Sequence, residues 1–407
     1  MNPRRQMLCW ALLAGGMPIA RSASAEPAER VADDGAVVSP ERRLAFPRDH
    51  GAHIGSAIEW WYVTGWLAAD VDRPDPAKVN AQGLTGFQIT FFRSRTGLAE
   101  ALTGRLAPRQ LLCAHAAVTR LDAAAGRRHR HGQRMARWNG DPARPAVHAA
   151  SADTDLALAG WRLWRDPSIA GAIHAPAGAM QAPAGAEPGY RAEVLVTEAG
   201  FALQLKLQPT QPILLQGQSG YSRKGPGTAQ ASHYLSQPQL DVQAQLTLDG
   251  RQQTLHGRAW LDHEWSNSLL AGDAVGWDWI GINMVDGSAL TVFVLRRADG
   301  SALWAGGSFR RVGAAPGNFA PNEVQMRPGR IWTSPATGGR YPVVWRIETP
   351  VGTFELAALL DEQELDSRAS TGAVYWEGLA ELRDRSGRRT GLGYLEMTGR
   401  VAPLRLG

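Results

Sequence analysis

The stretch DVQAQLTLDG, residues 241–250, decides the fold class of this 407-residue chain. Its even positions up to 248 hold Val, Ala and Leu, whereas its odd positions hold Asp, Gln and Thr. This alternation is typical of a half-buried β-strand, whose successive side chains point to opposite faces of a sheet. The closing pair Asp249-Gly250 favours a tight turn. The stretch therefore predicts one arm of an antiparallel hairpin.

Strand patterns continue on both sides of this hairpin. Before it, four runs rich in aromatic and β-branched residues predict strands at residues 59–67, 84–95, 111–121 and 201–209. After it, Asp286-Gly287, Asp299-Gly300 and Ser386-Gly387 lie between apolar runs and predict further hairpins. Residues 361–370 are the best candidate for a short helix or a loop. We expect an all-β protein whose strands close into barrels or stack as sandwiches.

The N-terminal residues 1–25 have the pattern of an export signal. Arg4-Arg5 precedes an apolar run, and Ala23-Ser24-Ala25 forms a small-residue cleavage site. We expect an exported protein, periplasmic or secreted, and the Arg pair leaves open whether the route is the general one or the twin-arginine one. The Ala-, Pro- and charge-rich residues 26–42 predict a flexible tether.

The length of the chain favours two folded domains. We place the first over residues 43–237 and the second over residues 238–407, because Pro238 would not fit a central position of a sheet. Residues 122–200 repeat Ala, Pro, Gly and Arg, and predict long loops of the first domain or an insertion in it.

Composition and motifs disfavour several classes of function. The net charge of +5 falls to about +2 without residues 1–25, which carry three Arg, so nucleic acid is not an expected partner. The chain has no Gly-x-Ser-x-Gly, no phosphate loop, no dinucleotide fingerprint and no His-Glu-x-x-His. These absences disfavour a serine hydrolase and a zinc peptidase.

The strongest candidate for a functional site is WLDHEWS, residues 260–266. On a strand, Trp260, Asp262 and Glu264 share one face, and Trp265 points to the other. An apolar surrounding disfavours the charged form of a carboxyl, so carboxyls beside indoles suit acid catalysis. The structural alternative is a strand corner in which Asp262 caps a turn and the tryptophans fill the core.

Two further clusters contain histidines. His233, in SHYLSQP, could orient water or share a proton with Asp262, or it could be a hydrogen-bonded histidine in a linking strand. In FPRDHGAH and the following EWW, His50 and His53 could ligate a metal. They lack a firm third ligand, so we expect an entrance loop there and no metal.

The chain resembles the carotenoid 1,2-hydratase and AttH-like group of two-domain, lipocalin-like proteins. The resemblance covers nearly all of residues 46–399. It rests on ten stretches: FPRDHGAH, EWWYVTGWL, GFQITFFRSR, AHAAVT, GYSRKG, SHYLSQPQL, WLDHEWS, GWDW, YWEG and GYLEMTG. The resemblance implies two calycin-type (lipocalin-like) antiparallel β-barrels packed together.

For function, the resemblance implies a hydro-lyase that needs no cofactor and adds water to a C=C bond of an apolar isoprenoid. Asp262 matches the acid, His233 its histidine partner, and Trp260 an aromatic residue on the same strand; His233 or Glu264 would accept the proton of water. We expect further aromatic residues of these motifs to bind substrate: Trp61, Tyr221, Tyr234, Trp265, Trp277 and Trp279.

Two other functions stay open at this point. One is an exported hydrolase of an ester or amide, in which Asp262, Glu264 and His233 activate water. The other is a carrier whose barrel holds an apolar ligand without turnover. In all three cases the expected partner is an apolar small molecule, collected with or without a transient contact with a membrane surface.

Overall fold

The computed structural model describes residues 38–69, 74–98, 107–122, 128–138, 146–171, 187–270 and 272–405. The expected export signal and most of the expected tether lie outside the described residues. The end of the tether is described, and there Arg42 Nη2 lies 2.9 Å from Asp49 Oδ1. Within the described ranges, no helix has the length and apolar character that crossing a membrane requires.

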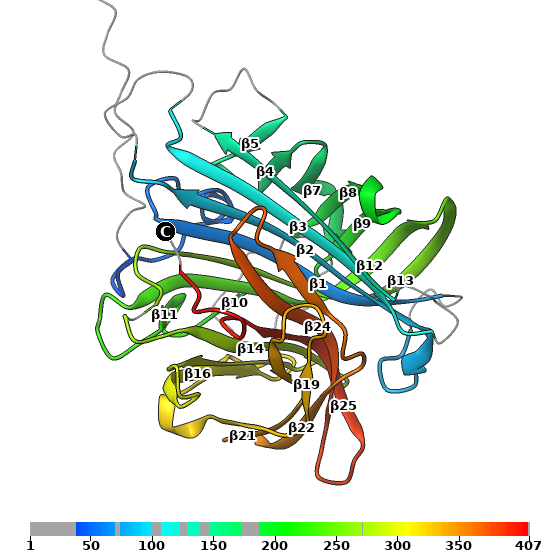
Figure 1. The fold of residues 1–407 in the computed structure, drawn as a ribbon, viewed down its shortest axis with the longest axis vertical. Helices are drawn as coiled ribbons and strands as arrows, with labels where there is room; N and C mark the ends of the chain where they lie inside the picture. Colours follow the sequence, from blue (N-terminus) through cyan, green and yellow to red (C-terminus); the bar gives the residue numbers. More distant parts are fainter. Residues whose placement is uncertain are drawn as a thin grey trace, which may run out of the picture. The chain divides into compact units, whose positions relative to one another are not determined.

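The first sheet is antiparallel and contains 13 strands (Figure 1). Its main path follows the order β4-β3-β2-β1-β13-β12-β9-β8-β7-β6-β5, and contacts of β4 with β5 and β6 bring the ends of the path together into a nearly closed barrel. Its strands are β1 (Ile58–Ala68), β2 (Leu84–Arg95), β3 (Gln110–Arg120), β4 (His129–Trp138), β5 (Val147–Ala149), β6 (Asp155–Leu158), β7 (Trp161–Gly171), β8 (Glu187–Val196), β9 (Phe201–Gln208), β10 (Leu214–Leu215), β11 (Tyr221–Arg223), β12 (Ala231–Leu248) and β13 (Arg251–Ser266).

The second sheet is also antiparallel and follows the order β17-β16-β15-β14-β25-β24-β22-β21-β18, with β23 paired to β24. Its strands are β14 (Gly276–Met284), β15 (Ala289–Arg296), β16 (Ala302–Arg310), β17 (Gly317–Phe319), β18 (Gln325–Pro328), β21 (Val344–Thr349), β22 (Gly352–Ala358), β23 (Glu364–Ser367), β24 (Ala373–Arg383) and β25 (Arg389–Met397). A separate pair is formed by β19 (Ile331–Thr333) and β20 (Arg340–Pro342). Four short 3-10 helices complete the described elements: η1 (Arg48–His50), η2 (Ala81–Gly83), η3 (Thr197–Ala199) and η4 (Pro321–Glu323).

The hairpin at residues 241–250 forms as the sequence predicts. β12 and β13 pair up to Leu248 and Arg251, and the two turn residues Asp249 and Gly250 have φ angles of 50° and 79°. Positive φ at both central positions matches the right-handed twist of the flanking strands, and Asp-Gly tolerates it well. The all-β expectation is confirmed, and two lipocalin-like antiparallel sheets make up the fold.

The expected domain boundary at Pro238 does not coincide with the change of sheet. Pro238 lies inside β12, where the pairing with β13 is irregular between Gln237 and Leu240. A bulge accommodates a residue that has no N–H to donate. The first sheet continues to Ser266, and the second begins at Gly276.

Two local expectations differ from the structure. Residues 122–200 contain β4 to β8, where the sequence predicted long loops or an insertion, although residues 172–186 lie outside the described part. Residues 361–370 contain strand β23 and no helix, because Leu365 packs against Ala117 and Tyr375. In both places, pairing and packing with distant strands outweigh a weak local preference.

Each sheet has its own apolar core, and a third cluster joins the sheets. The first core includes Trp61 and Phe87, and the second includes Trp345 and Trp376. The third combines side chains of both sheets, among them Tyr62, Trp66 and Trp260 from the first, and Trp279, Leu379 and Tyr394 from the second. The two sheets therefore pack directly on each other through aromatic side chains.

Candidate functional site

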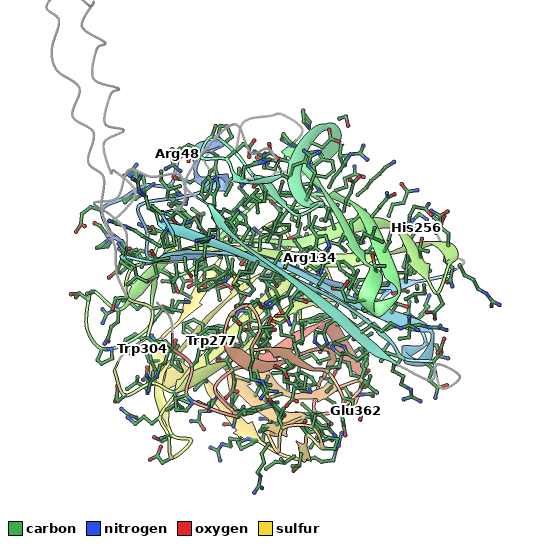
Figure 2. The ribbon with its side chains drawn as sticks, turned by 45° about the horizontal axis from the view of Figure 1, so that its top comes forward. Arg48, Arg134, His256, Trp277, Trp304 and Glu362 are labelled. Carbon is green, nitrogen blue, oxygen red and sulfur yellow. The ribbon has the colours of Figure 1, made fainter. Side chains whose placement is uncertain are left out.

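A cavity of about 410 Å³ lies where the two sheets meet. β1, β2, β12 and β13 contribute to one wall, and β14, β15, β24 and β25 contribute to the other. Eight of the lining residues are aromatic: Trp60, Tyr62, Phe92, Tyr234, Trp277, Trp279, Phe293 and Tyr375. Trp277, labelled in Figure 2, belongs to the wall of the second sheet. Charged and titratable side chains also belong to the lining, among them Lys224, Asp262, Glu264, Glu377 and Glu396.

Strand alternation places Asp262 in this cavity. On β13, Asp262 and Glu264 share one face, as the sequence predicted, and both line the cavity. Ser236 on β12 and Tyr62 on β1 lie directly opposite Asp262 in the two neighbouring strands. Residues opposite each other in antiparallel strands share a face. Asp262 is therefore surrounded by side chains of three strands.

The Asp262 carboxyl is buried, with 2% of the residue exposed. Its Oδ1 accepts hydrogen bonds from Ser236 Oγ at 2.5 Å and from Trp260 Nε1 at 2.6 Å. Its Oδ2 accepts one hydrogen bond, from Tyr234 Oη at 2.6 Å. The second lone pair of Oδ2 remains available to hold a proton.

Burial raises the pKa of Asp262 to about 7. The hydrogen bonds from Ser236, Tyr234 and Trp260 oppose this rise, and the nearby Glu264 adds to it. The largest influences on this pKa are burial, these three hydrogen bonds and the charge of Glu264. A carboxyl with a pKa near neutrality can both donate and accept a proton, which general acid–base catalysis requires.

Glu264 has a different environment, although it lines the same cavity. Lys224 Nζ lies 2.9 Å from Glu264 Oε1, and both side chains are 6% exposed. Ser232 Oγ also donates to Glu264 Oε1. Lys224 Nζ lies over the rings of Phe293 and Tyr234, at 4.2 and 4.7 Å from their centroids. Glu264 is therefore engaged in a salt bridge and is a poor candidate for a free base.

The second sheet contributes two carboxyls that the sequence reasoning did not identify as site residues. Glu377 on β24 and Glu396 on β25 lie directly opposite each other and line the cavity. Burial raises the pKa of both, and raises that of Glu396 to about 8. The motifs YWEG and GYLEMTG, on which the family resemblance partly rests, contain these two glutamates. The sequence therefore marked both positions, but it did not indicate a function for them.

His233 is not a partner of Asp262, and this part of the sequence prediction is wrong. His233 lies opposite Trp265 on β13, so its side chain points away from the cavity, to the face that carries Trp265. The two rings lie 5.4 Å apart between centroids. Burial, with smaller contributions from Arg42 and His53, lowers the pKa of His233 to about 4. His233 is therefore a neutral histidine of the first barrel.

The six aromatic residues predicted to bind substrate divide into two groups. Tyr234, Trp277 and Trp279 line the cavity. Trp61 and Trp265 point into the first barrel, where Trp61 stacks on His263 and Trp265 stacks on His53. Tyr221 is buried next to the β11–β12 connection and donates to the carbonyl of Thr228. Trp260 does not line the cavity, and it acts through its hydrogen bond to Asp262.

Behind β13, a buried polar network contains the histidines of the N-terminal motif. Glu59 Oε1 contacts His53 Nδ1 at 2.7 Å and His263 Nε2 at 2.9 Å, and Arg93 Nε contacts Glu59 Oε2 at 2.8 Å. His53 Nε2 also contacts Asp49 Oδ1 at 2.9 Å. His53, Glu59 and His263 are close enough to form a candidate metal group. Arg93 already supplies the cation for Glu59, and both ring nitrogens of His53 have partners, so the geometry fits a hydrogen-bonded network better than a metal site.

A second histidine joins the two sheets near the cavity. His115, on β3, contacts the hydroxyl of Tyr375, on β24, through Nδ1, and its Nε2 lies 2.8 Å from Ser370 Oγ. Ser370 Oγ also donates to Gln133 Oε1 at 2.5 Å. Burial lowers the pKa of His115 to about 3, so this imidazole is neutral. The Ser370 hydroxyl is thus held by two polar partners at the cavity wall.

The fold and the site together define a class of protein: two lipocalin-like β-sheets that enclose an apolar cavity with buried carboxyls. The chain belongs to the AttH-like family, which matches its residues 37–400. The resemblance to the AttH-like group noted in the sequence is thereby confirmed. No curated protein matches the chain in sequence.

Two solved structures show how far the likeness extends. An AttH homologue from Nitrosomonas europaea is 39% identical, with a TM-score of 0.75 over 90% of this chain and 100% of that chain. Kievitone hydratase from Nectria haematococca is 11% identical, with a TM-score of 0.57 over 89% of this chain and 95% of that chain. The second likeness is one of fold.

Proposed function

We propose that this protein is a hydro-lyase that adds water to, or removes it from, a carbon–carbon double bond of an apolar substrate, with Asp262 as the group that exchanges a proton with carbon. One observation carries the proposal: a buried carboxyl, held by three hydrogen bonds, lines a cavity rich in aromatic side chains, and burial raises its pKa to about 7. The name of the fold relative kievitone hydratase agrees with the same class of reaction.

The chemistry follows from the surroundings of Asp262. A protonated carboxyl donates its proton to one alkene carbon, and the other carbon becomes a tertiary cation. The faces of Trp277 and Trp279 line the same cavity and would stabilise this positive charge by cation–π interaction. A lone pair of water then forms the C–O bond with the cation, and the resulting oxonium ion loses a proton to a nearby carboxylate or to solvent, which leaves the neutral alcohol. These steps need neither an organic cofactor nor a metal.

The cavity size bears on the substrate. About 410 Å³ lies towards the lower end of the range of roughly 300–1,000 Å³ that is typical of pockets for small ligands. A compact isoprenoid fits such a volume. A carotenoid is longer than the cavity, so only one end group would enter it, as a reaction at the terminal double bond requires.

A non-catalytic carrier is the second candidate, since an apolar cavity of this kind also retains lipids. The buried carboxyls argue against it. A carrier would gain nothing from Asp262, Glu377 and Glu396, whose burial costs free energy whenever they ionise. An ester or amide hydrolase built on Asp262, Glu264 and His233 is disfavoured, because His233 points away from the cavity and Glu264 is bound by Lys224.

The test incubates the protein with compact isoprenoid alkenes and tertiary alcohols in D₂O and follows the products by mass spectrometry. We expect products that differ from their substrates by one water, with deuterium on the protonated carbon. The variant Asp262→Asn should lose about 10²–10⁴-fold in rate, the share that a positioned acid contributes. Its melting temperature should stay close to that of the wild type, which shows that the fold persists.

Asp286→Asn is a matched control, because Asp286 lies in a hairpin turn of the second sheet, outside the cavity. It should keep the full rate. A rate in Asp262→Asn equal to that of the wild type would contradict the proposal. Tight retention of an unchanged ligand by both proteins would favour the carrier.

A further inference from the structure

We propose that Glu377 and Glu396 form a hydroxyl-binding subsite on the wall of the cavity that faces Asp262. This subsite would hold the water that adds to the substrate, or the alcohol oxygen of the hydrated partner. The binding of a hydroxyl group here is argued from the geometry of the cavity alone. The reaction of that hydroxyl group rests on the proposed function.

The geometry of the second sheet brings the two carboxyls together. Glu377 and Glu396 are directly paired across β24 and β25, and Trp279 lies opposite Glu396 on β14. Side chains opposite each other in antiparallel strands have Cβ atoms about 5 Å apart. One small polar group can therefore contact both carboxyls at once.

One atom of this pair lacks a partner. Glu377 is 4% exposed, and neither its Oε2 nor the buried hydroxyl of Tyr62 makes a hydrogen bond of normal geometry with a described residue, although the Tyr62 hydroxyl is close enough to lower the pKa of Glu377. A buried polar atom without a partner destabilises the fold, because it has given up its hydrogen bonds to water and gained none in return. Because Glu377 lines the cavity, a ligand or a water in the cavity can supply the missing hydrogen bond.

The electrostatics select the kind of ligand. Burial is the main cause of the raised pKa of both carboxyls, and the charge of Glu396 adds to the rise for Glu377. Asp262 and Glu264 raise the pKa of Glu396, which shows that the carboxyls of both walls influence one another. A pair that retains protons both donates and accepts hydrogen bonds, as water and alcohols do. Carboxylate and phosphate ligands would be repelled once the pair loses a proton.

The subsite completes a balanced reaction. In the dehydration direction, the O–H bond of the pair breaks and its proton passes to the alcohol oxygen. The C–O bond then breaks, and its electron pair leaves with water. Asp262 takes a proton from the neighbouring carbon, and the C–H electron pair becomes the double bond. Hydration is the reverse, and no oxidant or reductant takes part.

Binding tests the subsite without any need for turnover. The probes are linalool, a compact tertiary isoprenoid alcohol, and myrcene, a hydrocarbon of similar size without the hydroxyl. Trp277 and Trp279 line the cavity, so the quenching of Trp fluorescence reports the binding of both. We expect Glu377→Met and Glu396→Met to weaken the binding of linalool about tenfold, and to leave myrcene unchanged. Glu355→Met, at an exposed position of β22, is the control.

Two binding results would overturn the subsite. One is an equal effect of the Met substitutions on both probes. The other is the lack of any preference of the wild type for linalool over myrcene. Because a Met variant could fold poorly, Glu377→Gln and Glu396→Gln, which keep the size of the side chain, serve for a second measurement.

Oxygen exchange separates the role of the pair from that of Asp262. In H₂¹⁸O, reversible loss of the hydroxyl exchanges the oxygen of linalool, even where no alkene forms. We expect Asp262→Asn to exchange oxygen without forming alkene, and the Gln variants to lose the exchange about 10²-fold or more. Exchange at the wild-type rate in both Gln variants overturns the subsite. If the wild type neither exchanges the oxygen of linalool nor forms an alkene, the hydro-lyase proposal is refuted. The subsite proposal is then tested only by whether the protein binds linalool more tightly than myrcene.

Discussion

Tyr234 Oη donates a hydrogen bond of 2.6 Å to Asp262 Oδ2 and accepts one of 3.1 Å from Trp279 Nε1. Tyr234 and Asp262 belong to the first sheet, and Trp279 belongs to the second. The phenol of Tyr234 therefore links the Asp262 carboxyl to a side chain of the second sheet. Because this hydrogen bond favours the ionised form of Asp262, Tyr234 moderates the effect of burial.

Replacing Tyr234 with Phe should raise the pKa of Asp262 above 7, because the variant lacks a donor that lowers it. In the hydration assay, the pH at which Asp262 loses its proton should move upwards. The measurement is the pH dependence of the rate, compared with that of Tyr221→Phe, whose hydroxyl bonds to Thr228 outside the cavity. A profile in Tyr234→Phe that is unshifted, or shifted to lower pH, would contradict the assignment.

The raised pKa of Asp262 also predicts how stability depends on pH. The unfolded carboxyl releases its proton near pH 3.9, whereas the folded one retains it up to about pH 7. The free energy of unfolding should therefore fall as pH rises through this interval, by roughly 4 kcal/mol for Asp262. Glu377 and Glu396 act in the same direction.

Urea unfolding of the wild type and of Asp262→Asn across this interval checks the prediction. The variant should show the smaller fall, since the titrating group is gone and the other carboxyls around the cavity remain. Equal slopes in the two proteins would mean that Asp262 is ionised in the folded state.

The salt bridge between Lys224 and Glu264 should matter more for stability than for proton transfer. Replacing Lys224 with Met leaves Glu264 as an unpaired buried charge, which costs about 3–5 kcal/mol. The double variant with Glu264→Gln should recover most of this loss. Urea unfolding of both variants measures the effect, and failure of the second substitution to restore stability would show that Lys224 acts through packing against Phe293 and Tyr234.

His233 should be dispensable for the reaction. Its ring lies on the face of β12 opposite to the cavity, so it contacts neither Asp262 nor a substrate in the cavity. His233→Asn should therefore change the rate by less than about twofold. The measurement is the same rate assay, normalised to the folded fraction. A loss as large as that of Asp262→Asn, in a folded protein, would restore the histidine to the mechanism.

The buried network around Glu59 should be structural and indifferent to metal. Arg93→Met removes the cation bonded to Glu59, and the free energy of unfolding should fall by about 3–5 kcal/mol. Adding zinc or a chelator to the wild type should leave the melting temperature unchanged. A zinc-dependent rise would instead make His53, Glu59 and His263 ligands.

Local sequence patterns account for much of the fold. The run at residues 84–95 coincides with β2, and the Asp249-Gly250 turn closes the hairpin as predicted. The alternation along β13 correctly separates Asp262 and Glu264 from Trp265, because the period of two is a property of any strand. These features depend only on neighbouring residues.

The features of the site that the sequence did not predict depend on pairing between segments that are distant in the chain. Nothing near His233 shows that antiparallel pairing sets it opposite Trp265, on the face away from Asp262. Glu377 and Glu396 follow Asp262 by more than a hundred positions and belong to another sheet, so only the packed structure brings them to the same cavity. The sequence therefore predicted the carboxyls of one wall and the tryptophans Trp277 and Trp279 of the opposite wall, but not the two carboxyls of that opposite wall.

The two-faced character of β13 limits how this protein can change during evolution. A single-residue insertion or deletion between the hairpin turn and Asp262 would turn the strand over. A deletion would put His263 where the acid now stands, an insertion would put Leu261 there, and either change would drive two carboxyls into the first barrel. Such a change would damage core and site together. Homologues should therefore vary freely in the lengths of their surface turns, while the number of residues from Gly257 to Ser266 stays fixed.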